Sequence, residues 1–430
     1  MRTEQESLSG TRKKISFGMP SEEVDEEIAK YCKKLSKEVE IKGFRKGKAP
    51  SSVVRRYFRE QIRREVGAQI VSTSLESFVK EQSLTPVGEP ELDVPPLEEG
   101  KEFSFSVTID VKPEIDIRDY EGVELQQEEA VVTEEEIAES LRQLQKAHAE
   151  LEGISEERGA QAGEVVLVDY EGSVEGVAFS GNQKKDVYIE IGPEGARKEM
   201  EEALLGVRPG ETRESEVEYP ENFMNRELAG KKVLYRLTAK KLLRKVLPEL
   251  DDEFAKDVGP YQGLEDLKGR LQEEVLREKR SRIRRRLEED LLQELIQRNP
   301  FEAPRSLVTA RHARMMDDAR GHFLSKGLFL EEKTEGYQRL ESDLEGLSEK
   351  EIKKELILDA VARKESIEVS DADVEQRLQE IARKHDQSLE KVRAEIQKQE
   401  DGLALFRRSL LNEKTLDFLL GKSKIKTVAK

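Results

Sequence analysis

The chain has 430 residues and a formal net charge of -17, with 91 acidic against 74 basic residues. Charged residues make up 38% and aromatic residues only 5% of the chain, a composition that favours long solvated helices over a compact enzyme core. This length corresponds to roughly two to four domains. The single cysteine, Cys32, excludes an intramolecular disulfide. Because no apolar run has the length of a signal peptide or a membrane span, we expect a cytoplasmic protein that does not enter a membrane.

Residues 1–112 have the pattern of one α+β domain. A helix beginning after Pro20 and a longer second helix are predicted from apolar residues at helical spacing: Val24, Ile28, Cys32, Leu35 and Val39 in the first, then Val54, Phe58, Ile62, Val66 and Ile70 in the second. Cys32 lies on the first apolar stripe, so we expect a buried structural thiol. Apolar and polar residues alternate over 103–111, which predicts a half-buried strand ended by Pro113.

Residues 42–64 contain nine basic residues and one acid, which is unusual in an acidic chain. Five arginines of the predicted second helix fall largely away from its apolar stripe: Arg55, Arg56, Arg59, Arg63 and Arg64. A helix with one apolar and one cationic face indicates a polyanionic partner.

The loop before this helix carries a more specific motif. Residues 43–50 have the sequence Gly-Phe-Arg-Lys-Gly-Lys-Ala-Pro, which resembles the G-F-R-x-G-x-x-P signature of trigger factors, the ribosome-associated chaperones of bacteria. The resemblance implies docking on the large ribosomal subunit near the exit tunnel, through ribosomal protein and rRNA. The residues that it assigns to ribosome binding are Gly43, Phe44, Arg45, Lys46, Gly47, Lys48 and Pro50.

Physical chemistry supports a docking loop independently. The two glycines permit a tight turn and a close approach to a partner, while Pro50 stiffens the entry into the next helix. We expect Phe44 at the loop tip, inserted into an apolar recess, with the neighbouring cations paired to phosphates or carboxylates. The alternative is an ordinary turn in which the Phe44 ring is buried and the lysines are solvated.

Residues 113–159 are predicted to link the first domain to the rest of the chain. The segments 130–144 and 367–381 are weakly similar: each is predicted to be a short strand, a hydroxyl N-cap with an acid three positions later, and a helix. Because two such units can pack in one body, we expect residues 113–159 to lie on the C-terminal body and the middle domain to be an excursion.

Residues 160–246 form the predicted middle domain, with short strands at about 165–170, 186–191, 212–219 and 232–243 separated by glycine turns. Three segments, 168–172, 205–211 and 219–220, together with Phe179, resemble an FKBP-type prolyl isomerase. That resemblance implies an antiparallel β domain and peptidyl-prolyl cis-trans isomerase activity. The candidate prolyl pocket is lined by four aromatic residues: Tyr170, Phe179, Phe223 and Tyr235.

This candidate pocket departs from the family pattern. Residues 197–200 are Arg-Lys-Glu-Met where isomerising trigger factors usually carry Ile-Pro-Gly-Phe, and Phe223-Met224 replaces a Tyr-His pair. Ser180 replaces the acid that often follows the pocket phenylalanine. Charges at a site that must desolvate a prolyl peptide argue for weak activity, and the alternative role of the four aromatic residues is to pack the domain core.

After Pro248 the chain is predicted to be helical. One long helix is expected from about Leu264 to Asn299-Pro300, followed by helices at about 304–324, 349–363, 371–385 and 402–420. The resemblance to trigger factors assigns residues 247–430 to an all-α chaperone domain whose arms shelter nascent and unfolded chains. The complete expectation is an elongated α+β multidomain protein.

Three functions follow from these patterns. The first is an ATP-independent chaperone that docks at the ribosomal exit tunnel and assists folding and export, as the trigger factor resemblance implies. The second is primarily a prolyl isomerase acting on unfolded chains, and the third is an RNA-binding protein that uses the 42–64 helix. No metal or cofactor is expected, because the four histidines are scattered and no phosphate-binding glycine loop occurs. The sequence leaves open whether the free protein forms a homodimer.

Overall fold

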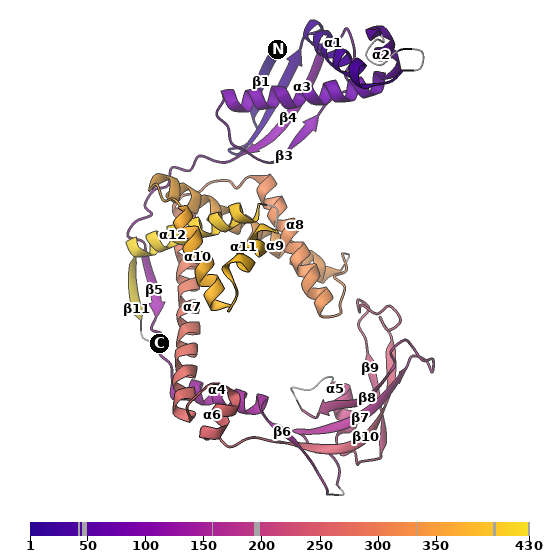
Figure 1. The fold of residues 1–430 in the computed structure, drawn as a ribbon, viewed down its shortest axis with the longest axis vertical. Coiled ribbons are helices and arrows are strands. Elements are labelled where there is room, and N and C mark those ends of the chain that lie inside the picture. The colour runs from indigo at the N-terminus through magenta and orange to yellow at the C-terminus, as the bar shows by residue number, and fades with distance from the viewer. Residues whose placement is uncertain are drawn as a thin grey trace. The chain divides into compact units, whose positions relative to one another are not determined.

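The computed structural model describes residues 1–41, 44, 50–156, 158–192, 198–332, 334–398 and 401–428 (Figure 1). The chain divides into two compact units. The first contains residues Met1–Glu124, Asp290–Met316 and Leu340–Lys424. The second contains residues Leu125–Glu289, Asp317–Arg339 and Ile425–Lys430. Each unit is therefore built from segments that are distant in the sequence.

The N-terminal part of the first unit is an antiparallel sheet with three helices. The sheet has the order β1-β2-β4-β3, with β1 at Arg2–Ser7, β2 at Arg12–Met19, β4 at Phe103–Val111 and β3 at Pro86–Asp93. The expected strand at 103–111 is confirmed, and its alternate residues from Phe103 to Val111 are buried. Phe17 of β2 is paired with Phe105 of β4, and their rings stack at 5.0 Å.

Helix α1 (Ser21–Glu38) confirms the first predicted helix. Its apolar stripe is buried, and Val39 packs against the same core. Cys32 has no exposed surface, and burial raises the pKa of its thiol, as expected for a structural residue that does not react.

The predicted second helix is instead two helices. Helix α2 (Ser51–Tyr57) ends at Phe58, and α3 (Arg59–Glu81) begins directly after it. Phe58 has φ -115° and ψ 26°, outside the helical region, although its N–H still donates to the Val54 carbonyl. The four-residue spacing predicted one straight stripe, but the chain bends at Phe58, and both Val54 and Ile62 are buried in the same core.

The remainder of the first unit is helical. It contains the C-terminal end of α7 (Leu264–Arg298), the beginning of α8 (Arg305–Ser325) and most of α9 (Glu335–Lys364). Helices α10 (Asp371–Lys384), α11 (Leu389–Gln397) and α12 (Gly402–Lys422) share an apolar core around Leu378 and Leu410. The long helix that ends before Asn299-Pro300 is confirmed, whereas α9 begins earlier than predicted and α11 was not predicted.

Residues 113–123 lie against these helices. The side chain of Ile117 is 1% exposed, and its carbonyl accepts a hydrogen bond from Lys364 at 2.7 Å. The Tyr120 hydroxyl donates to the Glu365 carboxylate. The next residues form β5 (Glu124–Glu128), which pairs with β11 (Lys424–Val428). The segment 113–128 therefore contacts α9 and pairs with the last strand of the chain.

The second unit contains α4 (Glu134–Ala147), which packs on α6 (Asp252–Val258) and the beginning of α7 through Leu141, Phe254 and Leu267. Its sheet is antiparallel with the order β6-β10-β7-β8, and β9 pairs with β10. The strands are β6 (Glu150–Gly153), β7 (Glu164–Ser173), β8 (Gln183–Glu190), β9 (Thr212–Glu218) and β10 (Lys232–Val246). Helix α5 (Lys198–Leu204) contributes Met200 and Leu204 to the core. The four predicted strands of the middle domain are therefore confirmed.

The two similar segments share their caps but not their strands. Thr133 and Glu136 form a capping box at the start of α4, and Ser370 and Asp373 form one at the start of α10. The residues before each cap are not in a strand, so that part of the prediction is wrong. The two helices also pack in different cores, one with α6 and α7 and the other with α11 and α12. Among the described residues, no helix is both long and apolar enough to cross a membrane.

Candidate functional sites

The predicted docking loop connects α1 to α2. Five of its seven candidate residues, Gly43, Arg45, Lys46, Gly47 and Lys48, lie outside the described residues. Phe44 is 41% exposed, while Ile41, three residues earlier, is buried and accepts a hydrogen bond from the Phe44 N–H at 2.9 Å. Pro50 is exposed and immediately precedes α2. The Phe44 side chain is therefore presented to solvent and is not sealed in the core.

The cationic face of α2 and α3 is partly neutralised. Three of its arginines form ion pairs: Arg55 with Glu99, Arg63 with Glu60 at 3.5 Å and Arg64 with Glu65 at 3.3 Å. Arg56 and Arg59 are exposed and form no ion pair with any residue that the structure describes. Net positive charge thus remains on this surface next to the docking loop.

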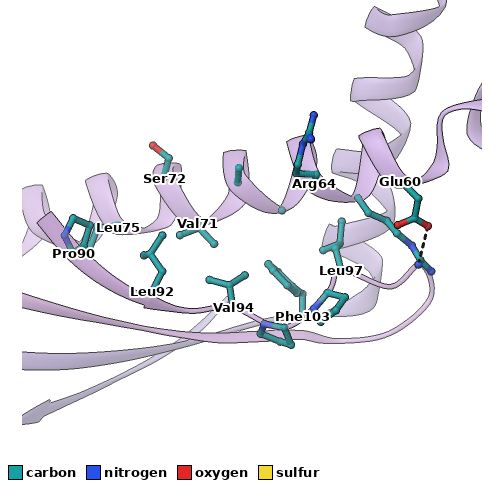
Figure 2. A pocket seen from close by; sticks show the side chains of 15 residues that line it. Glu60, Arg64, Val71, Ser72, Leu75, Pro90, Leu92, Val94, Leu97 and Phe103 are labelled. Carbon is teal, nitrogen blue, oxygen red and sulfur yellow. Dashed lines mark ion pairs between the residues drawn. The ribbon is translucent and has the colours of Figure 1, made fainter.

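A groove of about 650 Å³ lies between α3 on one side and the end of β3 with the segment that follows it on the other (Figure 2). Its floor includes Phe103 and Leu97, both 2% exposed, and its rim includes Leu92 at 56% exposed and Val94 at 38% exposed. Figure 2 shows Leu92 and Val94 on the strand side and Glu60 toward one end of the groove, whereas the Arg64 side chain points away from it. No sequence pattern predicted this groove, although Pro90, Pro95 and Pro96 mark an apolar segment that does not continue as a central strand.

The four candidate pocket residues lie in one aromatic cluster of the middle domain. The rings of Tyr170 on β7 and Tyr235 on β10 meet edge to face, with centroids 5.6 Å apart. Gly172 lies beneath two of the rings: a Cβ at this position would be 2.8 Å from Tyr235 and 3.0 Å from Phe179. Glycine is therefore required where the backbone passes under the cluster.

Tyr219 connects Phe223 to the same cluster. Its hydroxyl is 2.6 Å from that of Tyr235, and its ring is 4.6 Å from the ring of Phe223. Tyr219 and Tyr235 are 6% and 5% exposed, whereas Tyr170, Phe179 and Phe223 are half-buried. The buried pair packs the core, and the three half-buried rings are the ones within reach of a ligand. Tyr219 carried part of the family resemblance but was not predicted to belong to the pocket.

The described charges of the segment 197–200 do not lie in the candidate prolyl pocket, where the sequence comparison with isomerising trigger factors had suggested them. Arg197 lies outside the described residues, and Lys198 and Glu199 at the start of α5 are exposed. Met200 is 7% exposed and joins the core. The described charges therefore face solvent and do not occupy the aromatic cluster.

Comparisons with known proteins agree with this architecture. A family model described as bacterial trigger factor protein matches residues 1–144, its C-terminal counterpart matches residues 263–421, and the FKBP-type peptidyl-prolyl cis-trans isomerase model matches residues 156–241. A curated trigger factor from Geotalea daltonii is 33% identical over 426 residues, covering 98% of this chain and 97% of the relative. Another, from Halothermothrix orenii, is 32% identical over 429 residues, covering 98% of this chain and 99% of the relative.

A solved structure shares the fold over nearly the full length. It is described as "Promiscuous Substrate Recognition in Folding and Assembly Activities of the Trigger Factor Chaperone". It has a TM-score of 0.51 and 23% sequence identity, and the match covers 98% of this chain and 99% of that one. The α+β multidomain fold, with an FKBP-like antiparallel domain and a helical C-terminal domain, is thereby confirmed.

The fold defines a multidomain protein that joins an FKBP-type domain to a helical body. The full-length matches make the assignment specific, and the chain belongs to the trigger factor family of chaperones.

Proposed function

We propose that this chain docks on the large ribosomal subunit near the polypeptide exit through the loop around Phe44. The observation that carries the proposal is the exposure of the Phe44 ring, 41%, on a loop whose neighbour Ile41 is buried. An exposed ring on a loop whose backbone is bonded to a buried residue is suited to insertion into an apolar recess of a partner. Arg56 and Arg59 add positive charge beside the loop, which favours a partner rich in phosphate.

Ribosome co-sedimentation tests this docking. We compare the wild type with a variant in which Gly43, Phe44 and Arg45 are all alanine, and expect the variant to remain in the supernatant. Tyr57→Ala is a matched control, because Tyr57 is another aromatic residue of this domain and is 66% exposed. Equal pelleting of the wild type and the triple variant would remove the docking proposal.

We also propose a separate function for each domain of the chain. Residues 1–112 dock on the ribosome, residues 113–159 link this domain to the C-terminal body, residues 160–246 form the FKBP-like domain, and residues 247–430 bind unfolded polypeptide. The burial of Ile117 against α9 and of Leu141 against α6 and α7 supports the assignment of the linker. The proposed setting is the cytoplasm, where nascent chains emerge, and sedimentation velocity of the free protein tests for the homodimer.

The groove beside α3 is a proposed first contact for an emerging chain. Its occupant is an apolar extended segment, because the floor is apolar and the charges at one end, Arg63 and Glu60, are already paired with each other. The prolines along the opposite wall leave few backbone donors, so that side-chain burial supplies most of the affinity. This arrangement suits weak and varied binding of polypeptide.

A second candidate function is prolyl isomerisation by the FKBP-like domain. The half-buried rings of Tyr170, Phe179 and Phe223 favour it, since they adjoin a buried core and can desolvate a prolyl peptide. A prolyl-peptide assay tests the activity. We expect turnover above buffer that falls in Phe179→Ala, with Tyr188→Ala as the control, because Tyr188 lies on β8 and is 59% exposed. Turnover no faster than buffer would leave the aromatic cluster with a packing role only.

Simple RNA binding predicts a different behaviour. Binding through exposed arginines alone would be steeply dependent on salt and indifferent to Phe44. The docking proposal instead requires intact subunits and the Phe44 ring. Measuring the wild type and Phe44→Ala with free RNA and with subunits at two salt concentrations separates the two.

A further inference from the structure

A loop of the second unit pairs with the FKBP-like domain through its main chain. The loop contains Gly327, Leu328 and Phe329, between α8 and α9, and its partner is the segment 222–224, which follows β9. The Met224 N–H donates to the Gly327 carbonyl at 2.7 Å, and the Phe329 N–H donates to the Asn222 carbonyl at 2.7 Å.

These two bonds frame a short antiparallel bridge. Phe223 and Leu328 are directly opposite each other, in the arrangement that brings side chains closest. The side-chain amide of Asn222 adds a hydrogen bond to the Phe329 carbonyl at 2.8 Å. Recognition of the loop therefore depends mainly on backbone groups, which every polypeptide carries.

The bridge is continuous with the aromatic cluster. Phe223 contacts Tyr219, and Gly327 lies over the Phe223 ring, since a Cβ on this glycine would be 3.7 Å from the ring. Leu328 is half-buried, whereas Phe329 and Met224 are 40% and 52% exposed. The loop thus places one apolar side chain beside the cluster and leaves its neighbours in solvent.

We propose that residues 222–224 are a peptide-binding edge for extended apolar polypeptide, and that the 327–329 loop occupies this edge as an internal competitor. Strand addition of this kind gives affinity through the main chain and selectivity through alternate side chains. The proposal rests on the proposed role of this chain in binding unfolded polypeptide, and it names a site and a ligand class within the FKBP-like domain.

The hydrogen-bond pattern also defines which ligand positions tolerate proline. The Leu328 N–H donates to the carbonyl of Phe323 in the last turn of α8 at 2.9 Å and not to the edge. A ligand with proline at this central position therefore keeps both edge bonds and places the prolyl ring beside Phe223. Proline at the position of Phe329 removes the donor to Asn222. A chain with a proline at the central position is thus expected to bind with that proline beside the aromatic cluster.

Opening the internal contact tests the proposal in the full-length chain. Phe329→Pro removes the loop's donor while the edge is unchanged, and Phe329→Ala is the matched control that keeps the N–H. In Phe329→Pro we expect faster hydrogen exchange at the Met224 amide. We also expect a labelled peptide of sequence Lys-Gly-Leu-Phe-Leu-Glu to bind about tenfold more tightly, because the competitor then no longer fills the site.

Further variants and peptides test the proposal even if Phe329→Pro unfolds the loop. Asn222→Ala removes a side-chain bond from the loop and from the bound peptide alike, so it should not raise peptide affinity as much as Phe329→Pro does. Met224→Pro removes the donor of the edge itself and should abolish peptide binding. With the wild type, a peptide that carries proline in place of its first leucine, the position of Leu328, should compete as well as the parent peptide. A peptide with proline in place of its phenylalanine, the position of Phe329, should not compete. An unchanged Met224 exchange rate in Phe329→Pro, or equal competition by both proline peptides, would overturn the proposal.

Suppression of client aggregation, measured on the same preparations, separates this inference from the proposed function. If the wild type protects unfolded clients but the peptide results are negative, only the edge is disproved. If the wild type protects no client, the polypeptide-binding role fails, while the exchange of Met224 still shows whether the internal loop occupies the edge.

Discussion

The hydroxyl groups of Tyr219 and Tyr235 lie 2.6 Å apart in the core of the FKBP-like domain. The bond joins the residue directly after β9 to the first part of β10 and lies between the rings of Tyr170 and Phe223. It therefore fixes the orientation of the two buried rings against which the half-buried rings pack. The shape of the candidate prolyl site depends on this pair, even though neither residue is exposed enough to be its main contact.

Removing one hydroxyl of this pair should destabilise the domain. Tyr219→Phe and Tyr235→Phe are each expected to lower its free energy of unfolding by about 1 kcal/mol, the usual net value of such a bond. The double variant should lose less than the sum of the two, because both changes remove the same bond. Hydrogen exchange of β10 amides measures the effect in this domain alone. Strict additivity of the two changes would contradict the coupling.

Gly172 should not tolerate a side chain. A Cβ would approach Tyr235 to 2.8 Å, closer than real Cβ contacts, and Phe179 to 3.0 Å, tighter than most of them. Gly172→Ala is expected to displace both rings and cost about 1 to 3 kcal/mol, as overpacking does. Gly153→Ala in β6 is the control, because nothing lies within 4 Å of its added Cβ. Equal thermal stability of the two variants would show that the aromatic cluster can move aside.

Sequence patterns were sufficient for features governed by local rules. The alternation over 103–111, the stripe from Val24 to Leu35 and both hydroxyl caps appear as predicted, because each depends on neighbours a few residues apart. The bend at Phe58 was missed, since four-residue spacing fits a straight helix and a bent one equally well.

The arrangement of the sites depended on contacts between distant segments. The groove between Val71 and Leu92 and the bridge between Phe223 and Leu328 join residues that no periodicity relates. The four aromatic residues named from the sequence lie in one cluster, but the sequence did not indicate that Tyr235 is buried while the other three are half-buried. That division follows from strand pairing, which places Tyr235 opposite Gly172 and Ser215.

The groove beside α3 should lose client binding when its rim becomes charged. Leu92 is 56% exposed, so Leu92→Asp costs little folding energy but places a carboxylate over an apolar floor. We expect severalfold weaker protection of an unfolded client in an aggregation assay. Leu205→Asp is a matched control, because Leu205 is 54% exposed and lies far along the chain in the FKBP-like domain. If both variants protect equally well, the groove is not a client site.

The N-terminus of α10 should become less stable in acid. Hydrogen bonds from Lys414 and from Ser370 lower the pKa of Asp373 from 3.8 to about 2. The folded state therefore holds this carboxylate ionised more strongly than the unfolded chain does. Its contribution to stability is present above pH 3.8 and is lost as the pH falls toward 2.

The difference in melting temperature between the wild type and Asp373→Asn isolates this group from the many other carboxylates. We expect the difference to be largest above about pH 4 and to shrink as the pH is lowered to about 2, because protonation then removes in the wild type what the substitution removes at every pH. Lys414→Ala should move this decline to higher pH, since it removes the strongest cause of the lowered pKa. A difference that stays constant between about pH 2 and pH 5 would show that the contact with Lys414 does not stabilise the ionised carboxylate, and that the cap of α10 holds through its neutral hydrogen bonds alone.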